Sequence, residues 1–176
     1  EKDAEPGYVK HRKVDVIIEM GVDEVAETVR GLNCRRVVLT GGEPLLQEQG
    51  LVELMEALRG DGEEWFFEIE TNGTQMPGES LIAGMGQFNV SPKLANSGMS
   101  EELRIKTVVL DGLAATGKAW FKFVVQGERD IEEVLGIMAK TGILPTRVIL
   151  MPEGRSVAEI DKLAAWLAGR CRELGF

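Results

Sequence analysis

The sequence is poor in the residues that most often bind metals, with two cysteines and one histidine among its 176 residues. Cys34 and Cys171 lie far apart, and neither belongs to a Cys-x-x-Cys pair. Zinc and iron–sulfur sites need clustered ligands of this kind. We therefore predict two free thiols, and no metal-ligating residue within this chain.

Positive charge and long hydrophobic runs are scarce as well. There are 20 Lys and Arg against 29 Asp and Glu, giving a formal net charge of -9. A general nucleic-acid-binding protein needs a basic face, so direct binding of nucleic acid is not expected. No apolar run approaches the ~20 residues of a membrane span and no signal peptide is visible, which predicts a cytoplasmic protein that does not enter membranes.

The residues that are present describe an ordinary globular chain, with 44% hydrophobic and 28% charged residues. The length fits one domain covering residues 1–176. Short apolar runs predict strands at 35–40, 65–70, 87–90, 120–125 and 147–151. Amphipathic or helix-forming segments predict helices at 21–30, 45–58, 79–83, 101–115 and 130–140, with a last helix opened by a capping box of Ser156 and Glu159.

Strands that alternate with helices in this way predict an α/β fold with a parallel sheet and right-handed crossovers. Five repeats are too few to close a barrel of eight strands. We therefore expect a partial, incomplete parallel β/α barrel of about five to six strands. Residues 14–18 remain open between a short strand and the start of a helix.

The stretch Thr40-Gly41-Gly42-Glu43-Pro44 follows the first predicted strand. The two glycines remove side chains at the strand end, so that a ligand can lie directly against the backbone. Glu43 adds a carboxylate acceptor, and Pro44 suits the first turn of the next helix. A bare backbone beside an acid suits an ammonium group. From these residues alone, a tight turn without a ligand is equally compatible.

Other predicted strand ends also carry polar side chains, where parallel α/β proteins bind their ligands. Lys93 is a cation suited to a carboxylate, while Ser91 and Asn72 offer a hydroxyl and an amide. An ammonium site beside a carboxylate site matches the α-amino-acid end of a ligand. Each residue also has a plain alternative, since Asn72-Gly73 is a common turn and Lys93 can be a solvated charge.

Five segments resemble the 7-carboxy-7-deazaguanine synthase family of the radical S-adenosylmethionine superfamily. In chain order they are 40–45 (TGGEPL), 70–74 (ETNGT), 89–94 (NVSPKL), 121–125 (FKFVV) and 148–154 (VILMPEG). GGEP alone indicates the superfamily, and its combination with ETNGT and NVSPK is more specific. The fold that this resemblance implies is a radical-S-adenosylmethionine-like partial barrel, in a homodimer.

The resemblance also implies roles for individual residues, while no catalytic residue is assigned. The residues expected to bind S-adenosylmethionine are Gly41, Gly42, Glu43, Asn72, Ser91, Pro92 and Lys93. Thr40 and Glu70 are expected to contact the substrate.

The activity implied by the family is a carbon–nitrogen lyase of queuosine and 7-deazaguanine biosynthesis, a pathway of tRNA modification. It converts 6-carboxy-5,6,7,8-tetrahydropterin into 7-carboxy-7-deazaguanine with loss of ammonia. A 4Fe-4S cluster, fed by an electron donor such as flavodoxin or ferredoxin, cleaves S-adenosylmethionine reductively. The resulting 5′-deoxyadenosyl radical abstracts a substrate hydrogen, and Mg²⁺ assists the rearrangement.

The sequence departs from the family pattern in one respect. The family binds its cluster through three cysteines in a loop, followed by a magnesium-binding residue, and neither has a counterpart in these residues. We expect that loop before Glu1 and a further family segment after Phe176. The chain itself is then expected to bind S-adenosylmethionine weakly at best. Two alternatives stay open: another radical S-adenosylmethionine enzyme, such as an activase or a peptide-modifying enzyme, and a barrel-type binding protein without a cluster.

Overall fold

A computed structural model describes residues 17–60 and 62–176 and contains one sheet of five parallel strands. The strands are β1 (Arg36–Leu39), β2 (Phe66–Thr71), β3 (Gln87–Val90), β4 (Ala119–Val125) and β5 (Val148–Pro152). They lie side by side in chain order, from β1 to β5. Because all strands run in the same direction, their carboxyl ends meet at one edge of the sheet.

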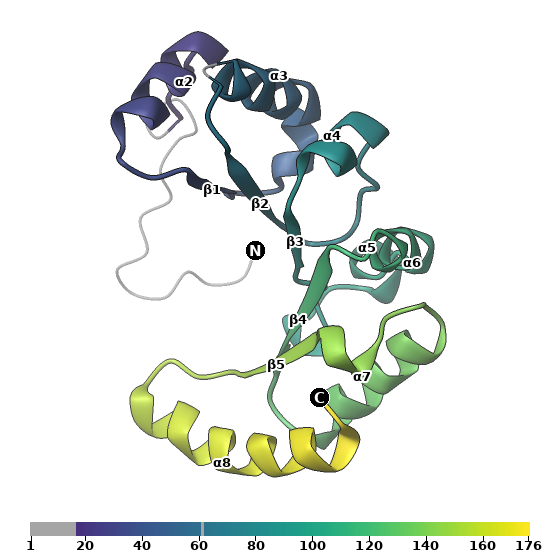
Figure 1. Ribbon diagram of the computed structural model, residues 1–176. Helices are drawn as coiled ribbons and strands as arrows, with labels where there is room; N and C mark the ends of the chain where they lie inside the picture. Colours follow the sequence, from purple (N-terminus) through teal and green to yellow (C-terminus); the bar gives the residue numbers. More distant parts are fainter. Residues whose placement is uncertain (1–16, 61) are drawn as a thin grey trace.

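The helices follow one another in an arc along one side of this sheet (Figure 1). They are α2 (Val22–Gly31), α3 (Glu48–Arg59), α4 (Glu79–Gly84), α5 (Glu101–Arg104), α6 (Thr107–Ala115), α7 (Glu128–Ala139) and α8 (Val157–Leu174). Three short 3₁₀ turns are η1 (Pro44–Gln47), η2 (Ala95–Ser97) and η3 (Pro145–Arg147). Among the described residues, no helix is long and apolar enough to cross a membrane.

The core lies between the sheet and the helices. Along β4 the side chains alternate, so that Phe121 and Phe123 are buried while Trp120 and Lys122 are partly exposed. Since successive side chains of a strand point to opposite faces, one face of the sheet packs on the helices, while no helix of the described residues covers the other, which we call the open face. The open face carries polar residues on β2, β3 and β4, which is where the candidate site lies.

The structure confirms the α/β class and each of the five predicted strands. In the described part of the chain β1 and β5 are the edges of an open sheet. The capping box of Ser156 and Glu159 is present at the start of α8. The open run 14–18 lies largely outside the described residues, and its described part, Ile17 and Ile18, is irregular.

One predicted helix is wrong as a continuous element. The segment 101–115 forms two helices, α5 and α6, because Ile105 adopts an extended backbone conformation (φ -118°, ψ 113°). Thr107, Val108 and Val109 are helical despite their local preference for strands. The break places the guanidinium of Arg104 in the interior, where this residue is 6% exposed.

Candidate functional site

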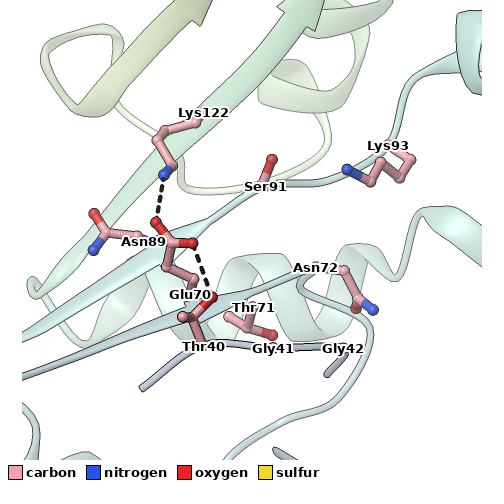
Figure 2. A pocket seen from close by; sticks show the side chains of 10 residues that line it. All are labelled: Thr40, Gly41, Gly42, Glu70, Thr71, Asn72, Asn89, Ser91, Lys93 and Lys122. Carbon is pink, nitrogen blue, oxygen red and sulfur yellow. Dashed lines mark hydrogen bonds and ion pairs between the residues drawn. The ribbon is translucent and has the colours of Figure 1, made fainter. Parts of the chain in front are cut away.

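A cavity of about 350 Å³ lies at the carboxyl ends of β1, β2 and β3, beside the middle of β4. Figure 2 shows the side chains that surround it. Its lining residues are Thr40, Gly41, Gly42, Glu70, Thr71, Asn72, Asn89, Ser91, Lys93 and Lys122. Sites for small molecules are commonly cavities of ~300–1,000 Å³ with a few convergent polar groups, and this edge of a parallel sheet is where they occur.

The two glycines after β1 give the cavity a bare wall. Gly41 and Gly42 have φ angles of +108° and +61°, a region that favours glycine. A Cβ atom added at either position would meet no protein atom within 4 Å. The glycines are therefore required by the backbone conformation, and the space beside them is open to a ligand.

Glu43 supports this wall from outside the cavity. Its Oε1 accepts hydrogen bonds from Thr71 Oγ1 (2.8 Å) and the Leu45 amide (3.3 Å), and its Oε2 accepts one from the Asn72 amide (2.8 Å). The carboxylate thus begins η1 and fastens the end of β1 to the end of β2. Both of its oxygens already have protein donors.

Glu70 is the anionic group of the cavity. Its Oε1 accepts a hydrogen bond from Lys122 Nζ (3.2 Å), and its Oε2 accepts one from Thr40 Oγ1 (3.0 Å), as drawn in Figure 2. The hydrogen bond from Lys122, the hydrogen bond from Thr40 and the charge of Lys122 lower the pKa of Glu70 below its ordinary value of 4.5. At neutral pH Glu70 is therefore ionised, and it links residues of β2 and β4 with the residue after β1.

A second acidic group lies one step further from the carboxyl ends, on the same face of β2. Glu68 accepts hydrogen bonds from Arg36 Nε, from Asn89 Nδ2 (2.9 Å) and from Gln87 Nε2 (3.2 Å). Burial raises the pKa of Glu68, but the hydrogen bonds from Asn89 and Arg36 outweigh it, so that the net pKa is lowered. Asn89 Oδ1 also accepts from Gln87 Nε2 (2.9 Å). These bonds fix the orientation of the Asn89 amide at the cavity.

Lys93 is the second cation of the cavity, and it differs from Lys122. Among the described residues, its ammonium has no hydrogen-bond or ion-pair partner, whereas Lys122 is paired with Glu70. In Figure 2 Lys122, Ser91 and Lys93 lie in one row, with Ser91 between the two lysines in this view. An unpaired ammonium beside an open cavity is suited to a ligand carboxylate or phosphate.

The structure brings together seven of the nine residues predicted from the sequence. Thr40, Gly41, Gly42, Glu70, Asn72, Ser91 and Lys93 line the cavity. Glu43 faces the β2 loop, and Pro92 is buried, so neither is among the lining residues. The binding roles assigned to all nine stay predictions.

Three lining residues were missed: Thr71, Asn89 and Lys122. Two of them had a signal in the sequence. Asn89 lies two positions before Ser91, so both share one face of the chain, and Lys122 interrupts an otherwise apolar strand. That Lys122 would pair with Glu70, 52 positions away, was not visible in the local sequence.

The described residues do not fit a 4Fe-4S cluster or a Mg²⁺ ion. Cys34 is an exposed free thiol before the start of β1, at the opposite end of the sheet from the cavity, and Cys171 is a free thiol on α8. Within residues 17–60 and 62–176, no group of three or more His, Cys, Asp or Glu side chains is placed to hold a metal. The cavity does fit the amino-acid end of S-adenosylmethionine, because a free cation and a bare backbone wall line the same space.

Comparison with known proteins gives several relatives, although no family model matches the chain. A 7-carboxy-7-deazaguanine synthase of Pyrobaculum aerophilum is 41% identical over 144 residues, covering 81% of this chain and 61% of that protein. A protein of the same name from Halobacterium salinarum is 32% identical over 179 residues, covering 89% and 67%. The GTP 3',8-cyclase 2 of Pseudomonas aeruginosa is 34% identical over 128 residues, covering 65% and 38%.

Proposed function

The chain belongs to the 7-carboxy-7-deazaguanine synthase family, and from this membership we propose that its cavity binds S-adenosylmethionine and a reduced pterin. The whole protein would convert 6-carboxy-5,6,7,8-tetrahydropterin into 7-carboxy-7-deazaguanine with loss of ammonia. Because the chain spans 61% of the Pyrobaculum relative, this activity is proposed for the whole protein. The observation that carries the proposal is the unpaired Lys93 facing the same cavity as the bare Gly41–Gly42 backbone.

The amino-acid end of S-adenosylmethionine would lie between these two features. The carbonyl oxygens of Gly41 and Gly42 would accept from its ammonium group, while Lys93 would pair with its carboxylate. Asn72 and Ser91 add an amide and a hydroxyl to the same wall. Glu43 and Pro92 would contribute by holding the two loops in place. When bound, S-adenosylmethionine supplies the 5′-deoxyadenosyl group for radical chemistry.

The pterin would lie over the anionic part of the cavity. The hydroxyl hydrogen of Thr40 is donated to Glu70, so that the Thr40 oxygen remains as an acceptor. Glu70 is ionised, and each carboxylate oxygen keeps a lone pair after its one protein hydrogen bond. Acceptors of this kind suit the ring N–H and amino groups of a pterin. Lys122 and Thr40 would orient the Glu70 carboxylate toward the ring.

The larger assembly is a proposal too. The open sheet would form part of an incomplete β/α barrel in a homodimer, with electrons supplied by flavodoxin or ferredoxin. The ligands of the cluster and of Mg²⁺ would come from outside the described residues, which hold no group of three or more His, Cys, Asp or Glu side chains placed to bind a metal. The residues of this chain bind and orient the two ligands and fix the charge of Glu70.

The test uses the full-length gene product, reconstituted with iron and sulfide without oxygen. It receives S-adenosylmethionine, a reductant and the carboxytetrahydropterin, and the deazaguanine product is sought by mass. We expect a product that lacks the elements of ammonia relative to the substrate. Cleavage of S-adenosylmethionine without this product would overturn the assigned reaction. The assignment to the radical S-adenosylmethionine superfamily would still hold.

A second candidate is favoured by the likeness to a GTP 3',8-cyclase, which points to another radical S-adenosylmethionine reaction. Supplying GTP in place of the pterin in the same assay separates the two. A new nucleotide product from GTP would favour the cyclase-like activity. Binding of S-adenosylmethionine without any cleavage would favour a binding protein without a cluster.

A further inference from the structure

The segment of residues 93–99, which we call the Lys93 loop, is held by a charged pair outside the cavity. The pair consists of Arg104, the last residue of α5, and Glu133 on α7. Arg104 is one of four buried polar or charged residues in the described part of the chain. Burying a guanidinium is costly unless its N–H groups are satisfied, so each of its partners is informative.

The partners of Arg104 are the two ends of the Lys93 loop. Its Nε donates to the Met99 carbonyl (3.1 Å), and its Nη1 donates to the Lys93 carbonyl (3.1 Å). Nη1 also pairs with Glu133 Oε1. The planar fork of a guanidinium can reach several acceptors at once, which a lysine ammonium does less well. One side chain thus fixes the start and the end of the loop.

Glu133 completes the arrangement from the neighbouring helix. Its second oxygen, Oε2, accepts a hydrogen bond from the Ala95 amide (2.9 Å). The pair therefore binds three backbone groups of the loop, at Lys93, Ala95 and Met99. These three contacts come from α5 and α7, and the Asn96 amide adds one contact to the sheet, donating to the Val124 carbonyl of β4 (2.9 Å).

This matters because Lys93 has no side-chain partner of its own in the described part of the chain. A free lysine side chain is flexible, and its average direction is set by the backbone that carries it. Arg104 binds the carbonyl of that same residue. The contact fixes the point from which the ammonium of Lys93 reaches the cavity.

We propose that Arg104, together with Glu133, is a positioning residue that orders the Lys93 loop and directs the Lys93 ammonium toward the carboxylate of the bound ligand. The identity of that ligand, S-adenosylmethionine, rests on the proposed function. The ordering of the loop rests on the contacts alone. The two parts are therefore tested separately.

The loop is tested first without ligand, by hydrogen–deuterium exchange of the 176-residue chain and its Arg104→Met and Glu133→Gln variants. The matched control is Lys118→Met. Lys118 also holds two backbone carbonyls, those of Ile82 (2.7 Å) and Met85 (2.8 Å), but it precedes β4 at the other end of the sheet. We expect the amides of Ala95 and Gly98 to exchange about tenfold faster in both test variants and unchanged in the control. Unchanged exchange in the test variants would show that the pair does not order the loop.

The ligand is tested next in the full-length gene product reconstituted with iron and sulfide, by comparing the Kd of S-adenosylmethionine with that of 5′-methylthioadenosine, which shares the adenosine and sulfur but lacks the amino-acid end. Arg104→Met should weaken S-adenosylmethionine about tenfold and leave 5′-methylthioadenosine unchanged, and Lys118→Met should change neither. In a Lys93→Met background, Arg104→Met should cause no further loss, because the two residues act through one contact. If Arg104→Met weakened the binding of both ligands equally, or if its loss of affinity added to that of Lys93→Met, Arg104 would have a structural role only.

Failures of the two proposals are distinguishable. If the unaltered full-length protein binds neither ligand, the proposed function and the carboxylate contact are both wrong, while the exchange experiment still decides whether Arg104 and Glu133 order the Lys93 loop. If Arg104→Met does not fold, Arg104→Lys replaces it. This variant keeps the charge beside Glu133 but lacks the fork, and it should show the same selective loss of S-adenosylmethionine affinity. An unchanged affinity in folded Arg104→Lys and Glu133→Gln overturns the proposal.

Discussion

The two faces of the sheet are built from the same strands, but only the open face carries a cluster of charged and amide side chains beside its apolar ones. The face under the helices carries four phenylalanines that are at most 1% exposed: Phe67, Phe88, Phe121 and Phe123. The open face carries charged and amide side chains joined to one another: Arg36, Glu68, Glu70, Gln87, Asn89 and Lys122.

The face under the helices contributes mainly to stability, and the open face contributes mainly to ligand binding. Buried aromatic side chains contribute mainly through the area removed from water and through close packing. Apart from the buried Glu68, the polar side chains of the open face gain little net stability from one another, because water competes for the same hydrogen bonds. They instead fix charges and amide orientations at the cavity. Changes on one face should therefore alter quantities that changes on the other face leave alone.

The largest expected effect contrasts two adjacent residues of β4, Phe121 and Lys122. Phe121→Ala should lower the free energy of unfolding by about 3–5 kcal/mol, because it leaves a cavity in the core. Lys122→Met should change it by less than about 1 kcal/mol, because its ion pair with Glu70 is partly exposed. Urea denaturation of both variants measures the contrast. Equal losses would mean that the open face is part of the stabilising core.

The next effect belongs to binding. Lys93→Ala should weaken S-adenosylmethionine by on the order of 1.5–3 kcal/mol, since it removes a charged hydrogen bond to the ligand. Its free energy of unfolding should not change, because the ammonium has no hydrogen-bond or ion-pair partner among the described residues. Calorimetric titration gives the affinity, and urea denaturation serves as the control. An unchanged affinity would mean that Lys93 is a solvated surface charge and does not contact the ligand.

A smaller, pH-dependent effect is expected at Glu68. Its pKa is lowered from 4.5 in the folded chain, so its ionised form stabilises the fold above about pH 4.5. That contribution is lost as the pH falls through the lowered folded-state pKa. Glu68→Gln should cost about 1–3 kcal/mol at pH 7, the range for hydrogen bonds to a charged group. The gap between variant and parent should narrow below pH 4.5.

Unfolding curves of Glu68→Gln and the parent chain at pH 7 and pH 3.5 give the difference in their free energies of unfolding at each pH. A gap that widens on acidification would reverse the assigned sign and would mean that the pKa of Glu68 is raised in the folded chain. Gln87→Ala is a useful companion, because it removes one donor to Glu68 and leaves Arg36 and Asn89 in place.

The smallest effect concerns the helices that cover the buried face. Ser156→Ala removes the side-chain acceptor of the capping box at α8 and should lower the free energy of unfolding by about 1 kcal/mol. Ser156→Asp keeps an acceptor there and should restore most of it. Thermal unfolding of the two variants makes the comparison. No difference between them would show that the side-chain acceptor at position 156 contributes nothing measurable to the stability of α8.

Features that depend on neighbouring residues were predicted from the sequence. The five strands follow from short apolar runs, and the start of α8 follows from the three-residue spacing of Ser156 and Glu159. The strand-end glycines were predicted as a bare wall, and their positive φ angles agree with it. In each case the cause lies within a few positions along the chain, so the sequence alone carries the information.

Only the tertiary structure decided which polar groups meet. From the sequence, Glu43 could bind a ligand or the neighbouring strand. In the structure its carboxylate accepts hydrogen bonds from the Thr71 hydroxyl and the Asn72 amide, at the end of β2. Lys122 reached Glu70 across 52 positions of sequence, and Arg104 reached the Lys93 carbonyl through the break between α5 and α6. The direction of a long side chain depends on where an acceptor lies in space, and that is settled when the strands and helices pack. The sequence by itself therefore determined the wall of the cavity, and the packing determined which charges face it.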